Sequence, residues 1–277
     1  MDQLKLVNDR LKKIEEIVND SSPGNAPEKW HVGVDLGTAD IVVIVTDENG
    51  EPHSAFMEWA EVVRDGIVLD YWKATQIVKE LLEKTERKLN IEIKSAITSY
   101  PPGTDPRTSK NVIEAAGLIV EGIIDEPSSV AHLLNMESGA VVDVGGGTTG
   151  IAIVRDKKII YSADEPTGGR HATLTIAGNQ GISFEKAEEM KRNGQAASLK
   201  PIVEPVFQKM ADIVRKHLEN YDTKDIYLSG GTFCFPGIDK VFIDELTGKN
   251  IILPYNPLYL TPLAIASYRV SGKETNG

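Results

Sequence analysis

The sequence has little cysteine and an unbalanced set of charges. Cys234 is the single cysteine among 277 residues, so the chain can form no internal disulfide and no thiolate metal centre. The simplest expectation for Cys234 is a small buried apolar residue. Lysine and arginine number 30 against 41 aspartates and glutamates, which gives a formal net charge of −11. This acidity disfavours binding to nucleic acid and electrostatic attraction to a membrane, so we expect neither as a partner.

Long apolar runs are also missing. No stretch reaches the roughly 18 apolar residues that a transmembrane helix needs, and the N-terminus lacks the basic and apolar regions of a secretory signal. We therefore expect a cytoplasmic protein. With 41% hydrophobic and 26% charged residues the composition is close to the globular average, which argues against a largely disordered chain. The length suggests about two domains.

An amphipathic helix is predicted over residues 1–22. Its apolar positions recur at spacings of three and four, with charged residues between them: Leu4, Val7, Leu11, Ile14 and Val18. A helix this short is marginal alone and needs a partner surface. Residues 23–29 are rich in proline, glycine and asparagine and form a predicted linker. Two interpretations stay open: the helix folds back on the body, or it docks on another protein or associates with itself.

Two segments of the body share one pattern. Each has a strand that ends in an aspartate, a turn of glycine and threonine, a second β-branched strand, a charged turn and a third strand. The first copy contains Asp35, Gly37 and Thr38, and the second copy contains Asp143, Gly145, Gly146, Gly147, Thr148 and Thr149. The repeat predicts two related lobes. We place the first lobe at residues 30–138 and 258–277, and the second at 139–257.

The repeated turns suggest a site for phosphate and metal. An aspartate at a strand end can hold Mg²⁺ directly or through water, and glycine and threonine let amides and hydroxyls approach phosphate oxygens. Two such turns facing across a cleft would grip a triphosphate from both sides. The alternative is that the turns use these residues only for backbone conformation. A dinucleotide fingerprint is excluded, because a strand and not a helix follows Gly145, Gly147 and Gly150.

These residues carry a resemblance to the actin-like ATPase superfamily, which includes sugar kinases, heat-shock chaperone ATPase domains and bacterial actin homologues. Five motifs typical of that superfamily have counterparts in the same order, at residues 35–38, 125–131, 143–148, 228–237 and 257–266. At closer range the chain resembles the ethanolamine-utilisation protein J family. That resemblance rests on the start at residues 35–40, on segments 63–66 and 181–184, and on the helical preface.

The resemblance implies an α/β fold of the duplicated actin-like ATPase type, with two lobes of mixed sheets flanked by helices. It implies ATP or ADP with Mg²⁺ as cofactors. Asp35 and Asp143 would hold the metal, and Glu126 and Asp143 would be catalytic. The remaining implied contacts are to phosphate by Gly37, Thr38 and residues 145–149, to the nucleoside by Gly230, Gly231 and Thr232, and to ribose and adenine by Glu188 and Lys191.

Two of these roles have simpler alternatives. Glu126 precedes Pro127 and could be an ordinary helix-start acid, favoured by the helix dipole. Glu188 and Lys191 lie on one helical face and could be a solvated ion pair.

The chain also departs from the superfamily pattern. No match for the chaperones' catalytic lysine exists between residues 46 and 98, and Cys234 stands where the chaperones have an arginine against adenine. Only 58 residues separate Gly169 from Leu228, so the outer subdomain of the second lobe must be reduced to helices. We therefore expect weak nucleotide affinity and slow turnover, if ATP is hydrolysed at all.

The resemblance implies a nucleotide-binding, chaperone-like accessory protein for ethanolamine utilisation or bacterial microcompartment enzymes, with weak Mg-dependent ATPase activity as an open question. Its partner would be a protein client, held by the N-terminal helix, and it would be associated with the microcompartment. Two alternatives stay open. One is an actin-like scaffold or filament protein. The other is a small-molecule kinase, for which Asp105 and Asp164 are available as bases.

Overall fold

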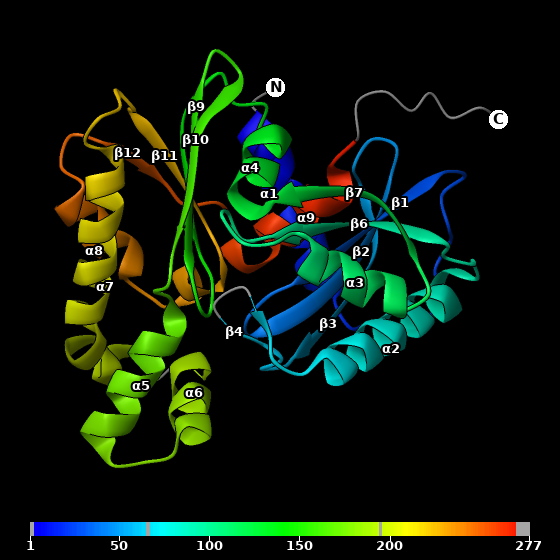
Figure 1. Ribbon diagram of the computed structural model, residues 1–277, viewed down its shortest axis with the longest axis horizontal. Helices are drawn as coiled ribbons and strands as arrows, with labels where there is room; N and C mark the ends of the chain where they lie inside the picture. The colour runs from blue at the N-terminus through cyan, green and yellow to red at the C-terminus, as the bar shows by residue number, and fades with distance from the viewer. Residues whose placement is uncertain (1–2, 65–66, 194–195, 270–277) are drawn as a thin grey trace.

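The computed structural model describes residues 3–64, 67–193 and 196–269, which form two α/β lobes side by side (Figure 1). Asp65 and Gly66 of the shared segment 63–66 lie outside the described residues. The first sheet contains β1 (Trp30–Leu36), β2 (Asp40–Asp47), β3 (Pro52–Trp59), β6 (Ser95–Tyr100) and β7 (Ile119–Asp125). The second sheet contains β8 (Ser138–Val144), β9 (Thr149–Arg155), β10 (Lys158–Glu165), β11 (Asp225–Ser229) and β12 (Asn250–Ile252).

The two sheets have the same topology, as the sequence repeat predicts. The strand orders are β3-β2-β1-β6-β7 and β10-β9-β8-β11-β12, so each sheet places its first strand in the centre. In both sheets that central strand is antiparallel to the next strand along the chain and parallel to a later one. Both sheets are therefore mixed, and the ends of β1 and β8 are equivalent positions.

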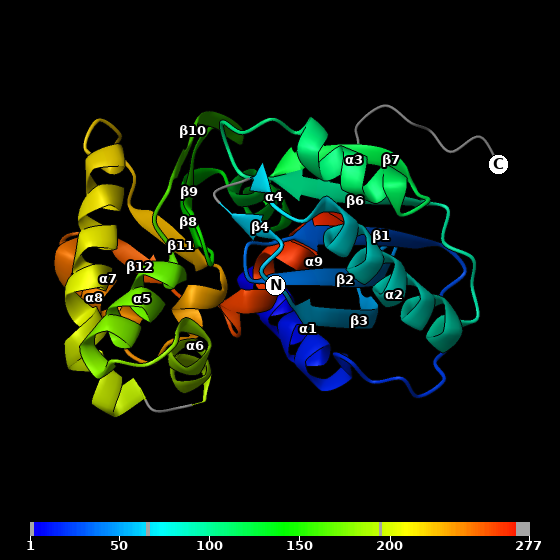
Figure 2. The same cartoon turned by 60° about the horizontal axis from the view of Figure 1, so that its bottom comes forward.

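Helices cover both faces of both sheets. On the first sheet, α2 (Tyr71–Leu89) and α3 (Arg107–Ala115) cover the outer face. Between the sheets lie α1 (Gln3–Ile17), α4 (Glu126–Leu133) and α9 (Leu260–Ser267). The outer face of the second sheet is covered by α5 (Gly169–Gln180), α7 (Ala196–Leu218) and α8 (Ile238–Glu245). Figure 2 shows the same layers after rotation.

This layering explains why the strands are apolar on both faces, and it places two aspartates on the faces between the sheets. Along β2, Ile41 and Val43 face the outer core of the first lobe, whereas Val42 faces the helices between the sheets. A strand buried on both faces reads as a continuous apolar run. Because strand side chains alternate, Asp35 and Asp143 belong to the faces that meet the helices between the sheets. The two acids therefore approach one another from opposite lobes.

The N-terminal helix folds back on the body. Val7, Leu11 and Ile14 of α1 are fully buried against residues of β2, β3, α4 and α9. The segment after it is also held, because the Gly24 amide donates to the Lys88 carbonyl at 2.9 Å. The apolar stripe is thus occupied by the body, and a partner would meet only the polar outer face of α1.

The outer part of the second lobe consists of helices, as its short length predicts. Between β10 and β11 the described residues form α5, α6 (Phe184–Arg192) and α7, with no strand among them. In Figure 1, α5 and α6 form the tip of this lobe. In the described ranges, no helix combines the length and apolarity needed to cross a membrane.

Candidate functional site

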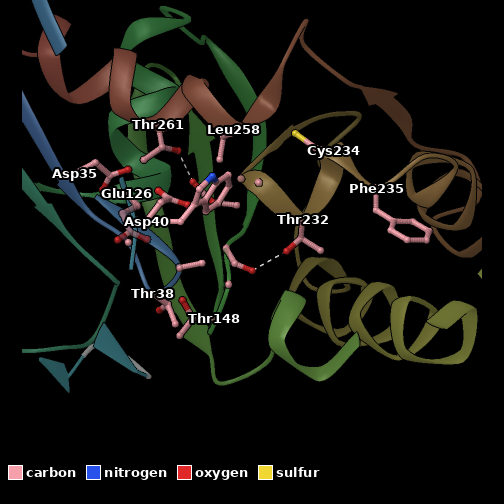
Figure 3. Close-up of a pocket in the computed structure, with 18 of the residues that line it drawn as sticks. Asp35, Thr38, Asp40, Glu126, Thr148, Thr232, Cys234, Phe235, Leu258 and Thr261 are labelled. Atoms are coloured by element: carbon pink, nitrogen blue, oxygen red, sulfur yellow. Dashed lines mark hydrogen bonds between the residues drawn. The ribbon is translucent and has the colours of Figure 1, made fainter. Parts of the chain in front are cut away.

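A cavity of about 320 Å³ opens between the lobes, where the turn after β1 meets the turn after β8 (Figure 3). Its floor contains acids from both lobes, and its far wall is formed by two short 3₁₀ helices, η1 (Gly231–Cys234) and η2 (Pro257–Tyr259). The cavity therefore lies where the two halves of the repeat face each other.

The two repeated turns are in direct contact. A methyl group on Gly147 would lie 2.8 Å from Thr38 Oγ1, and one on Gly146 would lie 2.9 Å from Ala39 Cβ. Glycine is therefore required at both positions by the approach of the opposite turn. A nucleotide whose phosphates pass between the turns would need the lobes to separate first.

The peptide planes of the second turn are oriented by its neighbours. The start of α5 donates from the Gly169 amide to the Gly145 carbonyl at 3.0 Å and from the Arg170 amide to the Gly146 carbonyl at 2.8 Å. Thr232 Oγ1 also donates to the Gly145 carbonyl, at 2.8 Å. In a trans peptide the next N–H points the opposite way. The amides of Gly146 and Gly147 therefore point away from α5, and within the described chain they donate to no protein acceptor.

Four carboxylates gather on the cavity floor: Asp35, Asp40, Glu126 and Asp143. Two of them are held by hydroxyls. Ser99 Oγ donates to Asp35 Oδ1 at 2.8 Å, and the Thr261 hydroxyl donates to Asp143. These hydrogen bonds aim one carboxylate from each lobe into the cavity.

Burial raises the pKa of all four acids, and repulsion from neighbouring acids adds to this at Asp35, Asp40 and Glu126. Burial, with the charges of Asp40 and Asp143, raises the pKa of Asp35 to about 7. The pKa of Asp40 rises to about 6 because of burial, although the positive charge of Arg192 opposes this. Burial and the neighbouring acids raise the pKa of Glu126 well above its ordinary value, and burial raises that of Asp143. A cation placed among them would relieve this repulsion.

The acids fit a hydrated Mg²⁺ better than a directly ligated one. Carboxylate oxygens are the hard donors that Mg²⁺ prefers, and this ion usually keeps several of its waters. Among the described residues, no three histidine, cysteine, aspartate or glutamate side chains converge closely enough to ligate a metal. Asp35 and Asp143 would therefore hold the ion through its water molecules.

The wall formed by η1 and η2 is the part of the cavity that the resemblance assigns to the nucleoside, and we call it the nucleoside wall. Its shape depends on Gly230. The φ of this glycine is +97°, and a methyl group there would lie 2.4 Å from the Val144 carbonyl oxygen and 2.5 Å from Asp143 Oδ1. The expectation that Cys234 is buried was wrong, because its side chain is exposed and lines the cavity. In the tight turn of η1, Phe233 takes the position facing the core, which leaves Cys234 on the open side.

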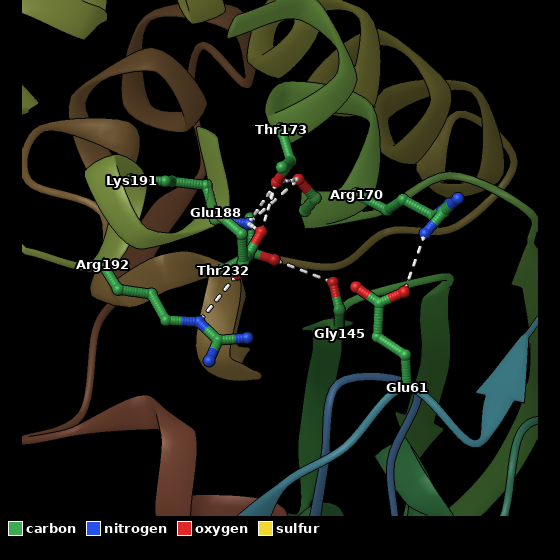
Figure 4. A network of polar contacts seen from close by, with 9 residues as sticks. Glu61, Gly145, Arg170, Thr173, Glu188, Lys191, Arg192 and Thr232 are labelled. Atoms are coloured by element: carbon green, nitrogen blue, oxygen red, sulfur yellow. Dashed lines mark hydrogen bonds and ion pairs between the residues drawn. The ribbon is translucent and has the colours of Figure 1, made fainter. Parts of the chain in front are cut away.

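The Glu188 and Lys191 pair is not a solvated ion pair. Lys191 Nζ lies 2.7 Å from Glu188 Oε2, and the two side chains are only 14% and 15% exposed. Lys191 also donates to Thr173 Oγ1 at 2.8 Å and to the Gly169 carbonyl at 3.2 Å (Figure 4). The pair therefore joins α6 to α5 at the edge of the cavity.

The structure brings nearly all the predicted site residues to one cavity. Those that line it are Asp35, Gly37, Thr38, Glu126, Asp143, Gly145, Gly146, Thr148, Glu188, Lys191, Gly230, Gly231 and Thr232. Gly147 lies behind this lining, against Thr38. Thr149 is fully buried and donates to the Thr167 carbonyl at 2.6 Å, so its hydroxyl cannot also face a phosphate there.

Glu126 is a helix-start acid that also lines the cavity. It is the first residue of α4, whose N-cap Asp125 accepts from the Ser128 amide at 3.1 Å.

Sequence reasoning missed the contacts that join the lobes at the cavity mouth. The Arg192 guanidinium lies 3.7 Å from the ring centroid of Trp59, and Arg192 Nε lies 2.7 Å from Glu188 Oε1. Arg170 and Glu61 form a second bridge, with 3.4 Å between Nη1 and Oε2. Arg192 directly follows Lys191 on the same helix, which was a usable signal, whereas Trp59 stands in no motif.

Comparison with known proteins gives closely similar relatives over nearly the whole chain. The chain is 47% identical over 265 residues to the ethanolamine utilization protein EutJ of Escherichia coli (strain K12), covering 96% of this chain and 94% of the relative. The crystal structure of ethanolamine utilization protein EutJ from Carboxydothermus hydrogenoformans superimposes with a TM-score of 0.90 at 41% identity, over 96% of this chain and 99% of that one.

More distant matches agree in fold. A family model described as Type IV pilus assembly protein PilM matches residues 129–262. The structure of MreB 5 of Spiroplasma citri bound to AMPPNP superimposes with a TM-score of 0.65 at 19% identity, over 86% of this chain and 95% of that one. At this identity the likeness concerns the fold alone.

Proposed function

The chain belongs to the EutJ family of ethanolamine utilization proteins and has an actin-like ATPase fold, and from this premise we propose that it binds ATP or ADP with Mg²⁺ in the cavity between its lobes. The MreB 5 structure with the same fold is bound to AMPPNP, which supports a nucleotide ligand. In this proposal the nucleotide is a switch that sets how far the lobes open.

One observation carries the proposal: the two repeated turns meet around four acids of raised pKa. The amides of Gly146 and Gly147 supply donors for phosphate oxygens. The carboxylates of Asp35 and Asp143 supply acceptors for the water molecules of a cation. An anionic phosphate chain alone would be repelled by those acids, so phosphate and cation would bind together.

The bound Mg²⁺ would supply positive charge at the phosphates. The chain itself would hold the attacking water with Glu126, whose pKa is raised by burial and by the neighbouring acids, so that it is a stronger base than an ordinary carboxylate. No lysine lines the cavity from the first lobe within the described residues. Hydrolysis would therefore lack one source of electrostatic stabilisation, and we expect it to be slow.

The output of the switch is an accessory, chaperone-like role toward protein clients of the ethanolamine pathway or its microcompartment. Because the apolar stripe of α1 is buried, a client would contact the exposed outer face of α1, which carries Lys5, Asp9 and Glu16. This surface is polar, which is typical of a transient and not a permanent complex.

Isothermal titration with Mg-ATP tests the nucleotide proposal. We expect weak binding by the wild type and a loss of about tenfold or more in Asp143→Asn, since one acid of the metal site is removed. Asp244→Asn is the matched control, because Asp244 is an exposed acid on α8 far from the cavity lining. Equal heats for the wild type and Asp143→Asn would refute the site, and submicromolar affinity would refute the expected weakness.

The same preparation separates the alternatives. An actin-like scaffold would sediment as a polymer when Mg-ATP is added, whereas the accessory protein stays in the supernatant. The kinase alternative has less support, because neither Asp105 nor Asp164 lines the cavity, and Asp105 pairs with Arg107 at the surface.

A further inference from the structure

The N-terminal helix contacts both places where the chain passes between the lobes. One crossing follows α4, at residues 134–137, and the other follows β12, at residues 253–256. Directly before the first, Gln3 Nε2 donates at 2.7 Å to the carbonyl of Leu133, the last residue of α4. At the second, Asn8 Oδ1 accepts from the Tyr255 amide at 2.8 Å. Any rotation of the lobes about these crossings must therefore move against α1.

Glu15 makes the strongest polar contacts of this helix with the second crossing. Its two carboxylate oxygens accept separately from the Tyr255 hydroxyl and from Asn256 Nδ2, the latter at 3.0 Å. Lys12 Nζ lies 5.6 Å from the centroid of the same tyrosine ring. Hydrogen bonds to a charged acceptor are stronger than neutral ones, so this acid fixes both residues at once.

Asn256 continues the path to the cavity. Its Oδ1 accepts from Cys234 Sγ at 3.6 Å, and Cys234 lines the nucleoside wall. The backbone of Asn256 has φ +30°, an uncommon conformation that neighbouring contacts must hold in place. The next residue, Pro257, accepts from the Gly230 amide at 3.0 Å. Helix α1 is thus linked to both η1 and Gly230 through one short segment.

We propose that α1 is a brace on the hinge, and that Glu15, through Asn256, couples this helix to the nucleoside wall of the cavity. The proposal rests on the proposed function only in that the cavity is named as a nucleotide site. A molecule that draws Glu15 away from Asn256 would loosen the wall around Cys234 and ease the opening of the lobes.

The chain carries its own reporter, because Cys234 is the single thiol. We expect Glu15→Ala, without nucleotide, to speed the reaction of Cys234 with the aromatic disulfide DTNB roughly fivefold, as for one charge-assisted hydrogen bond lost at an exposed position. Tyr255→Phe removes a single hydroxyl and should give a smaller increase. Glu80→Ala is the matched control, since Glu80 is an exposed acid on α2 that makes no hydrogen bond or ion pair among the described residues.

Two further measurements separate the effect of the Glu15 charge on the thiol pKa from the access of DTNB to Cys234. Burial raises the pKa of the Cys234 thiol, and the charges of Asp40 and Glu15 add to this. Labelling is therefore followed across pH to yield the thiol pKa and the limiting rate separately. Glu15→Gln removes the charge but keeps hydrogen-bonding groups, and its limiting rate should stay near that of the wild type. A limiting rate unchanged in Glu15→Ala overturns the brace.

Failure of the brace and failure of the nucleotide site give different results. Protection of wild-type Cys234 by Mg-ATP tests the cavity as a nucleotide site, whereas the Glu15→Ala rate is measured with no nucleotide present. Fast labelling of Glu15→Ala without any protection by Mg-ATP would support the brace and refute the nucleotide site.

Discussion

Neutralising Asp35 should stabilise the nucleotide-free protein. The acid is 7% exposed and shares the cavity floor with Asp40 and Asp143, and these conditions raise its pKa from 3.8 to about 7. A carboxyl group whose pKa is higher in the folded state than in the unfolded state destabilises the fold once it is ionised. Asp35→Asn removes that charge but keeps an oxygen that can accept from Ser99. The substitution should therefore increase the melting temperature while it weakens binding of Mg-nucleotide.

The magnitude follows from linkage. A rise from 3.8 to about 7 corresponds to about 4 kcal/mol of stability lost above pH 7. The asparagine side chain that replaces Asp35 is also buried and loses hydration, and this cost offsets about half of the gain in stability. The expected increase of about 2 kcal/mol corresponds to a rise in Tm of about 4–8 °C for a chain of this size. The gain should be absent near pH 4, where the acid is protonated in the folded state, and should grow from there to pH 7.

The assay is thermal unfolding of the nucleotide-free protein at pH 4, 6 and 8, followed by circular dichroism. Asp244→Asn, on the exposed face of α8, controls for the loss of one surface charge and should leave Tm unchanged. Two results would contradict this prediction: a lower Tm for Asp35→Asn than for the wild type at pH 8, or an equal difference in Tm at pH 4 and pH 8. Either would show that the ionised Asp35 carboxylate does not destabilise the fold.

Three further outcomes are expected. Gly230→Ala should lower the free energy of unfolding by about 2–3 kcal/mol in urea titration, because its φ of +97° and its backbone contact exclude a methyl group. Trp59→Leu removes the ring under Arg192 and should speed release of a fluorescent nucleotide analogue about threefold, whereas Trp72→Leu, at an exposed site on α2, should not. Leu11→Ala should destabilise the whole fold by about 2–4 kcal/mol, because a fully buried side chain is truncated; a loss confined to the helix signal would contradict this.

Much of the fold could be predicted because the signals are local. The Asp-Gly-Thr turns consist of residues that are close in sequence, and each is followed by a β-branched run that is typical of a strand. The same spacing predicts equivalent strands in equivalent positions, which the two strand orders confirm. The helical outer part of the second lobe followed from the shortness of this segment compared with the superfamily pattern.

The site was predicted where its residues stand in motifs and missed where they do not. Asp35, Asp143 and Gly230 could be named because each belongs to a short motif whose other residues are close in sequence. Trp59 could not be named, because it stands in no motif and its contact with Arg192 joins two lobes. Arg192 could have been suspected only from its place next to Lys191. Thr149 was predicted to contact phosphate together with Thr148. It is the first residue of β9, where neighbouring side chains point to opposite faces, and its hydroxyl donates to the Thr167 carbonyl instead.

The sequence by itself determined the duplication, the acid at the end of each central strand and the glycines that let the turns approach, since these depend on residue type and spacing along the chain. Tertiary structure alone decided three other matters. It buried the apolar face of α1 instead of leaving it to a partner, opened Cys234 to the cavity, and raised the pKa of the acids by bringing them together. Burial and electrostatic repulsion depend on which distant segments become neighbours, and only the folded chain specifies those.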